Sequence, residues 1–225
     1  MSKVIISFSG GIDSTAAVIE TMKRYPKKDC ELVYEDTGGE YAGTVEFVQE
    51  MAGLFELPLS IIRYQRDWYE QIEHDNMPFT PALRKCTHRL KLDVFNSWLS
   101  KNKITGPEVV LVTGIRAEES QSRSRLPEED IDDKNRRIWR PVLYRSKEEA
   151  KEMVKAEGLP IHYCYEFSSR CNCAWCVFAG KYEMQAYAEL HPEDYEKACL
   201  LEEKIDKHLI QHGWINDLMK QSRMI

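Results

Sequence analysis

The chain opens with the stretch that decides its fold, KVIISFSGGIDST, which runs from Lys3 to Thr15. Its first half is a short apolar run rich in β-branched residues, and helix-forming residues follow the small residues of its second half as far as Tyr25. This order predicts a strand, a tight turn and a helix. The glycine pair at Gly10 and Gly11 lets backbone N–H groups approach a polyanion where a Cβ would obstruct it. The unpaired amides at the start of the helix would favour a phosphate at the same place.

The same alternation of strands and helices continues along the chain. Further strands are expected at 31–35, 59–64 and 108–113, and further helices at 44–55, 67–73, 88–101 and 146–157, with two more between 181 and 219. Repeated strand–helix units imply an α/β fold, a doubly wound parallel sheet with helices on both faces. Residues 118–137 are rich in charge, which predicts a mobile loop. We expect a nucleotide-binding domain over 1–145 and a cysteine-rich, helical extension over 146–225 in the same globule.

Composition excludes some broad classes of protein. Of the 225 residues 43% are hydrophobic and 30% are charged, as is usual for a globular protein. No apolar run is long enough to cross a bilayer, so no membrane partner is expected. The run from Val4 to Phe8 is too short for the core of a signal peptide, which predicts a cytoplasmic location. The formal net charge of −6 argues against binding nucleic acid by overall attraction, and leaves local basic patches open.

The side chains of the glycine turn suit a phosphate ligand. Ser9, Ser14 and Thr15 offer hydroxyl donors, and Asp13 would hold the turn or help to position a magnesium ion bound to phosphates. The spacing differs from that of a Walker loop, because no lysine follows the second glycine. A glycine pair after a strand also occurs in turns that are merely tight, so the pair alone leaves phosphate binding open.

Two further polar segments follow predicted strands. Asp36–Glu40, with the sequence DTGGE, comes after the second strand, and Thr113–Ser120, with the sequence TGIRAEES, comes after the fourth. Open α/β sheets place their ligands at the carboxyl ends of the strands. We therefore expect both segments and the glycine turn to converge on one crevice. A solvated, ion-paired loop is the alternative for the charged residues that end the second segment.

The glycine turn resembles the SGGxDS loop of the ATP pyrophosphatases, which hold the pyrophosphate of ATP while the α-phosphorus is attacked. Together with the two polar segments, it resembles the phosphoadenosine phosphosulfate reductase-like family over residues 3 to 180. The resemblance implies a Rossmann-like, adenine nucleotide alpha hydrolase fold and ATP with Mg²⁺ as ligand. Base and ribose contacts are implied near Asp36–Glu40, and phosphate contacts at Arg116 and Arg123. The expected nucleotide contacts are Ser7, Ser9, Gly10, Gly11, Asp13, Ser14, Thr15, Asp36, Thr37, Gly38, Glu40, Gly114, Arg116 and Glu119.

Four of the seven cysteines crowd into a short segment, at positions 164, 171, 173 and 176. Thiolates at C-x-C and C-x2-C spacing can converge on one iron–sulfur cluster or zinc ion without a long loop closure. In a reducing compartment such a cluster suggests metal ligation instead of disulfides. The spacing leaves the choice of metal open. Cys30 and Cys199 stand alone and are expected to be small buried side chains.

Cys86 lies in the basic string RKCTHRLK, residues 84–91, which resembles the segment where the reductase-like family carries a cysteine or a cysteine pair. In iron–sulfur members that position joins a later C-x2-C, which implies Cys86, Cys173 and Cys176 as ligands of a 4Fe-4S cluster, with zinc as the alternative. Cys164 and Cys171 compete for the fourth position. The segment around Cys171 departs from the Arg-x-Gly-Cys of relatives, which would make it an extra thiol.

Two chemistries fit this resemblance. A sulfonucleotide reductase would use a nucleophilic cysteine in a C-terminal tail, and the last nine residues, DLMKQSRMI, contain none. The intact glycine turn favours ATP instead. We therefore expect an ATP pyrophosphatase that adenylates an acceptor for sulfur transfer, with the reductase as the alternative.

In that reaction Asp13 would position Mg²⁺–ATP, and Arg116 or Arg123 would stabilise charge on the leaving pyrophosphate. The acceptor would be a nucleic acid or a small molecule. The sulfur would come from a cysteine desulfurase or a carrier protein, and a homo-oligomer is expected.

A third reading comes from another class of protein. The chain would be a non-catalytic, zinc-stabilised module that binds nucleic acid through Arg84–Lys91 and through Arg136, Arg137 and Arg140. Its acidic charge balance and the three nucleotide motifs argue against this reading.

Overall fold

The computed structural model describes residues 3–222, which pack into two compact units that interleave along the chain. The first unit consists of Met1–Glu35, Gly43–Ile62 and Phe95–Tyr163, and the second of Asp36–Ala42, Arg63–Val94 and Cys164–Ile225. The sequence motifs suggested a division after residue 145. Packing groups residues 146–163 with the first unit, and residues 36–42 and 63–94 with the second.

The first unit is built on a six-stranded sheet in the order β3-β2-β1-β4-β6-β5. The strands are β1 (Lys3–Ser7), β2 (Cys30–Asp36), β3 (Leu59–Arg63), β4 (Val109–Thr113), β5 (Glu129–Ile131) and β6 (Arg137–Trp139). β1 pairs in parallel with β2 and with β4, and β4 in parallel with β6, while β5 runs antiparallel to β6. The predicted α/β class with a mostly parallel sheet is confirmed.

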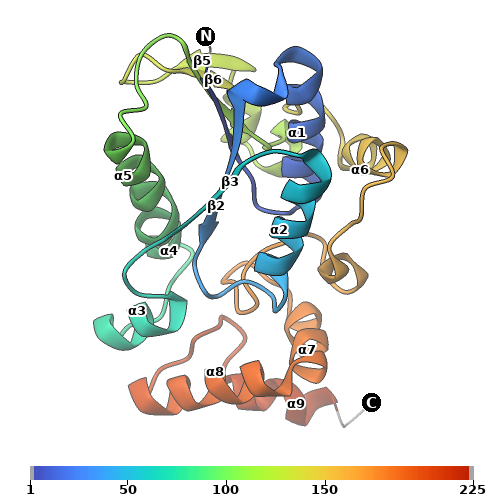
Figure 1. The fold of residues 1–225 in the computed structure, drawn as a ribbon. Helices are drawn as coiled ribbons and strands as arrows, with labels where there is room; N and C mark the ends of the chain where they lie inside the picture. The colour runs from blue at the N-terminus through green and yellow to red at the C-terminus, as the bar shows by residue number, and fades with distance from the viewer. Residues whose placement is uncertain (1–2, 223–225) are drawn as a thin grey trace. The chain divides into compact units, whose positions relative to one another are not determined.

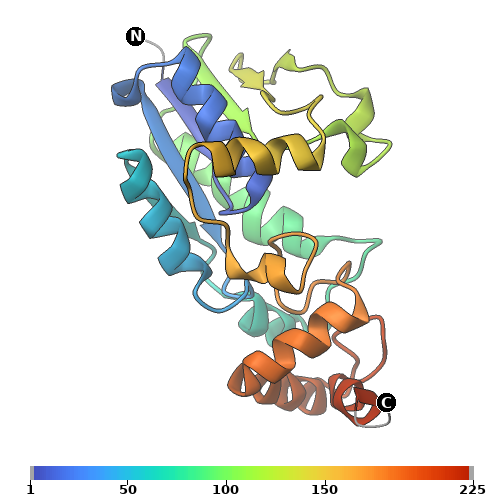
Figure 2. The same cartoon turned by 90° about the vertical axis from the view of Figure 1, so that its right-hand side faces the viewer.

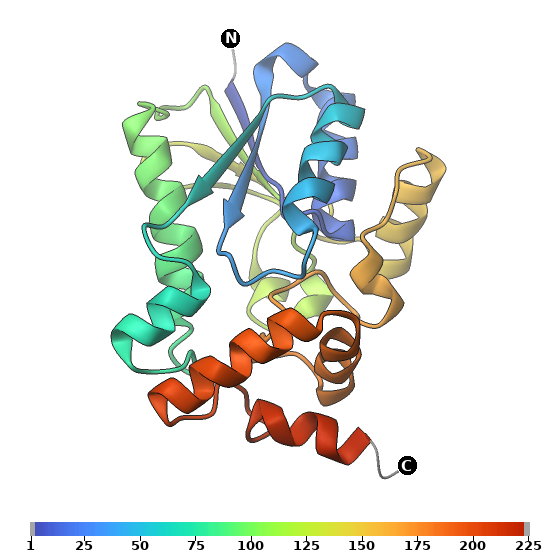
Figure 3. The same ribbon diagram turned by 60° about the horizontal axis from the view of Figure 1, so that its bottom comes forward.

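Helices cover both faces of this sheet, and the central strands are accordingly apolar throughout. Val4, Ile5 and Ile6 of β1 are fully buried, because successive side chains point to opposite faces of the sheet and helices cover both faces. α1 (Ile12–Arg24) and α2 (Thr44–Phe55) lie on one face and α5 (Asp93–Lys101) on the other (Figures 1 and 3). α6 (Lys147–Ala156) packs against α1, as Figure 2 shows.

The strand order reverses direction next to β1. The chain moves from β1 to β2 and β3 on one side, and β4 then pairs with the other edge of β1. At such a switch point the loops after the two strands diverge and leave a crevice, where open α/β sheets bind their ligands. In this protein those loops are the glycine turn after β1 and the segment after β4.

The prediction of a mobile loop over 118–137 was wrong for its second half, because β5 and β6 form a hairpin that extends the sheet. Arg136 and Arg140 are each only 7% exposed. The Arg136 Nε donates to Asp132 Oδ2 at 2.7 Å, and Arg140 Nη1 donates to the carbonyl of Pro127 at 2.8 Å. Two of the three arginines that the nucleic-acid reading assigned to a surface are therefore buried.

The helix expected at 88–101 divides into a π-helical turn over His88–Leu92 and α5. A short helix, α4 (Lys85–Thr87), directly precedes it. The wider turn buries Leu90 completely. Short 3-10 turns occur at Lys27–Asp29, Ala117–Glu119, Arg123–Arg125 and Tyr163–Glu166.

The second unit is largely helical. Its main helices are α3 (Trp68–Asp75), α7 (Lys181–Leu190), α8 (Pro192–Ile205) and α9 (Ile215–Ser222). α3 begins with a capping box between Asp67 and Glu70. The core contains Trp175 and Tyr187, which meet edge to face with ring centroids 5.7 Å apart. Across residues 3–222, no helix combines the length and the apolar character that a membrane crossing requires.

A buried carboxylate joins α8 to α9. Glu202 is 1% exposed, and its two oxygens accept the backbone N–H groups of Leu209 at 2.7 Å and Ile215 at 2.6 Å. Ile215 is the first residue of α9, so the carboxylate lies at the N-terminal end of that helix, where negative charge is favourable. Burial is the main cause that raises the pKa of Glu202.

We expect Glu202→Gln to destabilise the protein by about 1–3 kcal/mol, since an amide offers one acceptor oxygen to two buried N–H groups. Urea unfolding measures the effect. Glu203→Gln, at the exposed neighbouring position, is the matched control and should change stability by less than about 0.5 kcal/mol. Equal effects of the two substitutions would contradict the assigned role.

Candidate functional site

The glycine turn after β1 adopts a backbone that requires glycine. Gly10 has φ +74°, and a Cβ there would lie 3.1 Å from Val48 Cγ2 and 3.3 Å from Phe47 Cδ1, both on α2. Helix α1 begins two residues later, at Ile12. The turn therefore presents backbone amides and the positive end of α1 together, which is the arrangement that favours a bound phosphate.

Two of the predicted phosphate-binding hydroxyls have a structural role in the turn. Ser14 Oγ donates to the carbonyl oxygen of Gly11 at 2.9 Å, and Thr15 Oγ1 donates to the same oxygen at 3.0 Å. Both residues are almost fully buried. Each hydroxyl has a single proton, and Ser9 Oγ lies 3.2 Å from Ser14 Oγ, so the Ser9 hydroxyl is engaged within the turn as well. A phosphate at this turn would therefore meet backbone amides.

The segment after β4 packs directly on the start of α1. A Cβ at Gly114 would lie 2.5 Å from the backbone oxygen of Asp13 and 2.5 Å from Ser14 Cα. No side chain fits in that space, so a glycine is required for the two segments to touch. The structure thus brings the glycine turn and the Thr113–Ser120 segment together, as the sequence predicted.

Arg116 and Asp13 form an ion pair at this contact. Arg116 is 6% exposed, and its Nε donates to Asp13 Oδ1 at 2.7 Å. Its guanidinium also pairs with Glu118, and its backbone N–H donates to Glu119 Oε2 at 3.1 Å. Arg123 pairs with Glu119 in turn. The predicted residues Asp13, Arg116, Glu119 and Arg123 therefore belong to one charged network in the first unit.

A buried hydroxyl group ends β4 beside this network. Thr113 Oγ1 has no hydrogen-bond partner among the described residues, and it directly precedes Gly114. On the neighbouring strands Ser7 Oγ donates to Glu35 Oε1 at 3.3 Å, so the predicted contact Ser7 already has a partner.

The Asp36–Glu40 segment belongs to the second unit and forms a compact turn. Asp36 Oδ1 accepts the N–H of Gly38 at 2.9 Å, and its other oxygen lies 3.4 Å from Arg63 Nε. Burial is the main cause that raises the pKa of Asp36. The Glu40 carboxylate accepts the N–H of Thr37 at 3.1 Å and its hydroxyl at 2.7 Å. The nucleotide contacts expected of these side chains stay a prediction.

The same turn pairs with the C-x2-C segment, a contact that the sequence did not reveal. Glu40 and Cys173 form an antiparallel bridge, and the N–H of Ala174 donates to the carbonyl of Gly39 at 2.8 Å. Thr37 Oγ1 lies 3.7 Å from Cys173 Sγ. Pairing of this kind has no periodic signature because it involves single residues far apart in the chain.

Three of the predicted metal ligands, Cys86, Cys173 and Cys176, belong to the second unit. Burial raises the pKa of both Cys86 and Cys173, and the thiol of Cys176 acts electrostatically on each of them in the same direction. Lys91 opposes the shift at both thiols. Cys173 and Cys176 share one tight turn, because the N–H of Cys176 donates to the carbonyl of Cys173 at 3.2 Å.

The two candidates for a fourth ligand are thiols that lie next to each other. The sulfur atoms of Cys164 and Cys171 lie within 4.8 Å, and the hydrogen bond between them is the main cause that raises the pKa of Cys164. The predicted competition between these two residues is not decided by their positions. Cys30 and Cys199 are buried, as expected of isolated cysteines.

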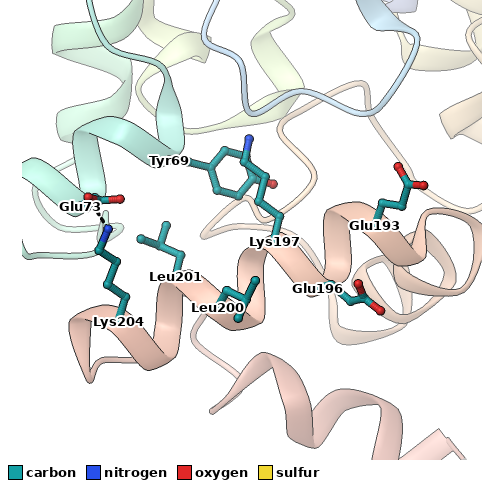
Figure 4. A pocket seen from close by; sticks show the side chains of 8 residues that line it. All are labelled: Tyr69, Glu73, Glu193, Glu196, Lys197, Leu200, Leu201 and Lys204. Carbon is teal, nitrogen blue, oxygen red and sulfur yellow. Dashed lines mark hydrogen bonds and ion pairs between the residues drawn. The ribbon is translucent and has the colours of Figure 1, made fainter.

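A groove of about 360 Å³ lies between α3 and α8 in the second unit (Figure 4). The Lys197 ammonium lies 3.8 Å from the centroid of the Tyr69 ring, and Lys204 pairs with Glu73 at 2.6 Å. The Tyr69 hydroxyl accepts the indole N–H of Trp175 at 3.0 Å. The carboxylates of Glu193 and Glu196 also line the groove, so its wall carries charges of both signs.

A family model described as the phosphoadenosine phosphosulfate reductase domain matches residues 3–170. An uncharacterised protein of Methanocaldococcus jannaschii is 28% identical over 194 residues, which cover 85% of this chain and 45% of the relative. The chain spans just under half the length of the curated relatives that it matches first.

Two solved structures share the fold. Phosphoadenylyl-sulfate reductase from Candida auris superposes with a TM-score of 0.58 at 12% identity, over 77% of this chain and 82% of that one. FMN adenylyltransferase from Candida glabrata, in complex with FMN and an ATP analogue, gives a TM-score of 0.53 at 18% identity, over 76% of this chain and 55% of that one. At these identities the likeness extends to the fold alone.

We expect Gly114→Ala to destabilise the protein by about 1–3 kcal/mol, because its Cβ would overlap backbone atoms that cannot move independently of α1. Urea unfolding measures the change. Gly53→Ala in α2 is the matched control: a Cβ there would meet nothing within 4 Å among the described residues. That substitution should stabilise the helix by about 0.5–1 kcal/mol. Effects of the same sign would refute the close contact.

Proposed function

The chain belongs to the phosphoadenosine phosphosulfate reductase domain family, as its motifs indicated, and on that premise we propose that it is an ATP pyrophosphatase. An oxygen of the acceptor attacks the α-phosphorus of ATP, the bond between the α- and β-phosphates breaks, and pyrophosphate leaves. Sulfur at the sulfide level, delivered by a carrier thiocarboxylate or as a persulfide that a second thiol reduces, then attacks the atom that bears the adenylated oxygen. The bond from that atom to oxygen breaks, and AMP leaves with the oxygen. The acceptor is a nucleic acid or a small molecule, and the sulfur comes from a cysteine desulfurase or a carrier protein.

The contact between Gly114 and the first turn of α1 is the observation that carries this proposal. It holds an arginine, an aspartate and the N-terminus of a helix together at the switch point of the sheet. Backbone amides and the helix end bind the phosphates of ATP. Asp13 positions the magnesium ion, whose ligands are oxygens.

Arg116 stabilises the charge that develops on the leaving pyrophosphate, and Arg123 assists it through Glu119. A buried guanidinium already oriented by two carboxylates costs little reorganisation when the phosphates arrive. When the triphosphate binds, its oxygens replace some of the carboxylate contacts that Asp13 and Glu118 make with Arg116.

The cysteines support a metal centre by the chemistry of their donors. Cys86, Cys173 and Cys176 offer three thiols, of which Cys176 acts electrostatically on the other two, and Cys164 or Cys171 offers a fourth. A donor set of sulfur alone suits a 4Fe-4S cluster or a zinc ion. Bound there, the cluster would supply a place to carry or activate sulfur. The bridge between Glu40 and Cys173 ties the proposed base and ribose segment to this centre.

The alternative reaction is reduction of a sulfonucleotide, which the name of the matching family model favours. Protein purified under anaerobic conditions is assayed for pyrophosphate from ATP and, separately, for sulfite from phosphoadenosine phosphosulfate with a thioredoxin-type donor. Sulfite without pyrophosphate would replace the proposed function by the reductase. Neither product, together with bound zinc, would support a non-catalytic module.

We expect Arg116→Ala to weaken Mg²⁺–ATP binding by about 10- to 100-fold, because a charge-assisted hydrogen bond is lost and Asp13 is left uncompensated beside the phosphates. Fluorescence competition with a labelled ATP analogue measures the affinity. Arg116→Ala combined with Asp13→Asn should lose less affinity than the sum of the two single losses, because the two side chains act as a pair. Exposed Arg145→Ala is the control. Additive losses in the double variant would contradict the pairing.

We expect Cys86→Ala, Cys173→Ala and Cys176→Ala each to lose the metal centre, while Cys30→Ala and Cys199→Ala keep it. Iron, sulfide and zinc contents and the visible spectrum are measured on anaerobic protein. Comparison of Cys164→Ala with Cys171→Ala identifies the fourth ligand as the one whose loss removes iron. A colourless protein that contains zinc would refute the iron–sulfur assignment and leave the ligand set standing.

A further inference from the structure

Two arginines converge on one exposed phenylalanine in the second unit. The guanidinium of Arg84 lies 5.5 Å and that of Arg170 lies 5.8 Å from the centroid of the Phe178 ring. All three side chains are exposed, and the ring itself is 49% accessible. We call these three residues the Arg–Phe surface. Leu83 and Tyr182, close to them in the chain, are also exposed large side chains.

The charges of this surface are not balanced by neighbouring acids. Nearby cations of the same basic string are neutralised locally: Arg89 pairs with Asp75 at 2.8 Å, and Lys91 pairs with Glu40 at 3.7 Å. Within residues 3–222, neither Arg84 nor Arg170 has a carboxylate within ion-pair distance. Glu183, the acid that follows Phe178 in the chain, accepts the backbone N–H groups of Ser169 and Gly180.

Like charges gathered at one ring repel each other, and a bound polyanion relieves that repulsion. The arginines can neutralise phosphates, and their planar guanidiniums and the accessible ring offer faces on which bases stack. Unpaired nucleotides supply both groups at once, whereas the bases of a duplex are already stacked. An acidic peptide supplies the charge without the planar rings.

The chain places this surface beside the cysteines. Arg84 precedes Cys86 by two residues, Arg170 directly precedes Cys171, and Phe178 follows Cys176 by two residues. We propose that the Arg–Phe surface binds an unpaired segment of nucleic acid and that such a segment is the acceptor for sulfur. This inference rests on the proposed function, since it names the acceptor of that reaction. The net charge of −6 makes the attraction local, which suits a short single-stranded site.

The test uses the full chain and fluorescein-labelled single-stranded RNA and DNA of about 12 nucleotides, with anisotropy measured at several salt concentrations. We expect single strands to bind and Phe178→Ala to weaken binding by about 5- to 100-fold. Arg84→Ala combined with Arg170→Ala should reduce the slope of log affinity against log salt by about 1.4, because each phosphate contact contributes about 0.7. Phe178→Trp should retain or improve binding.

Tyr144→Ala combined with Arg145→Ala removes an exposed aromatic ring and an exposed arginine from the first unit, and it should leave binding unchanged. Equal binding of the corresponding duplex, full competition by polyglutamate, or unaltered binding by Phe178→Ala would each overturn the proposal. Thermal unfolding and Mg²⁺–ATP affinity are measured on the same samples. If the unmodified protein binds oligonucleotides but neither binds ATP nor releases pyrophosphate, the proposed function is wrong. If it binds ATP and releases pyrophosphate but does not bind oligonucleotides, the assignment of the Arg–Phe surface is wrong.

Discussion

The site in the first unit depends on a contact between two backbones that leaves no room for a side chain. Gly114 meets Asp13 and Ser14 at a distance that a single Cβ would close. Parallel strands of a doubly wound sheet end on the same edge, so the loops after β1 and β4 are neighbours, and the glycine lets them touch. Everything polar that follows, including the orientation of Arg116, is built on that contact.

Two carboxylate partners offset the free-energy cost of burying Arg116. A guanidinium that is 6% exposed would be costly without compensation, and Asp13 and Glu118 provide it. The same arrangement is preorganised for an anionic ligand, because a phosphate needs donors that already point inward. The hydroxyls of Ser14 and Thr15 hold the turn closed, so the proposed phosphate site depends on the same hydrogen bonds as the turn itself.

In the second unit, two segments far apart in the sequence pair with each other. The Asp36–Glu40 turn follows β2, and the C-x2-C segment lies about 130 residues later, yet Glu40 and Cys173 pair as neighbouring strands do. Thr37 reaches both the Glu40 carboxylate and the Cys173 sulfur. Movement of either segment therefore displaces the other. The proposed nucleotide segment and the proposed metal centre, coupled in this way, would respond together to a bound ligand.

By itself the sequence determined the α/β class and the strands that carry the glycine turn and the TGIRAEES segment, because hydrophobic periodicity and glycine geometry act over a few neighbouring residues. The family followed from the resemblance of its motifs to those of known proteins. The sequence failed for the β5–β6 hairpin, because strands of three residues are too short for a periodic pattern. β6 joins the sheet by pairing with β4, and β5 by pairing with β6. Only the tertiary structure decided that Glu40 meets Cys173, that Cys164 pairs with Cys171, and that Arg170 and Arg84 share the ring of Phe178. Contacts between single residues far apart in the chain leave no local pattern, since the energy that selects them comes from packing of the whole unit.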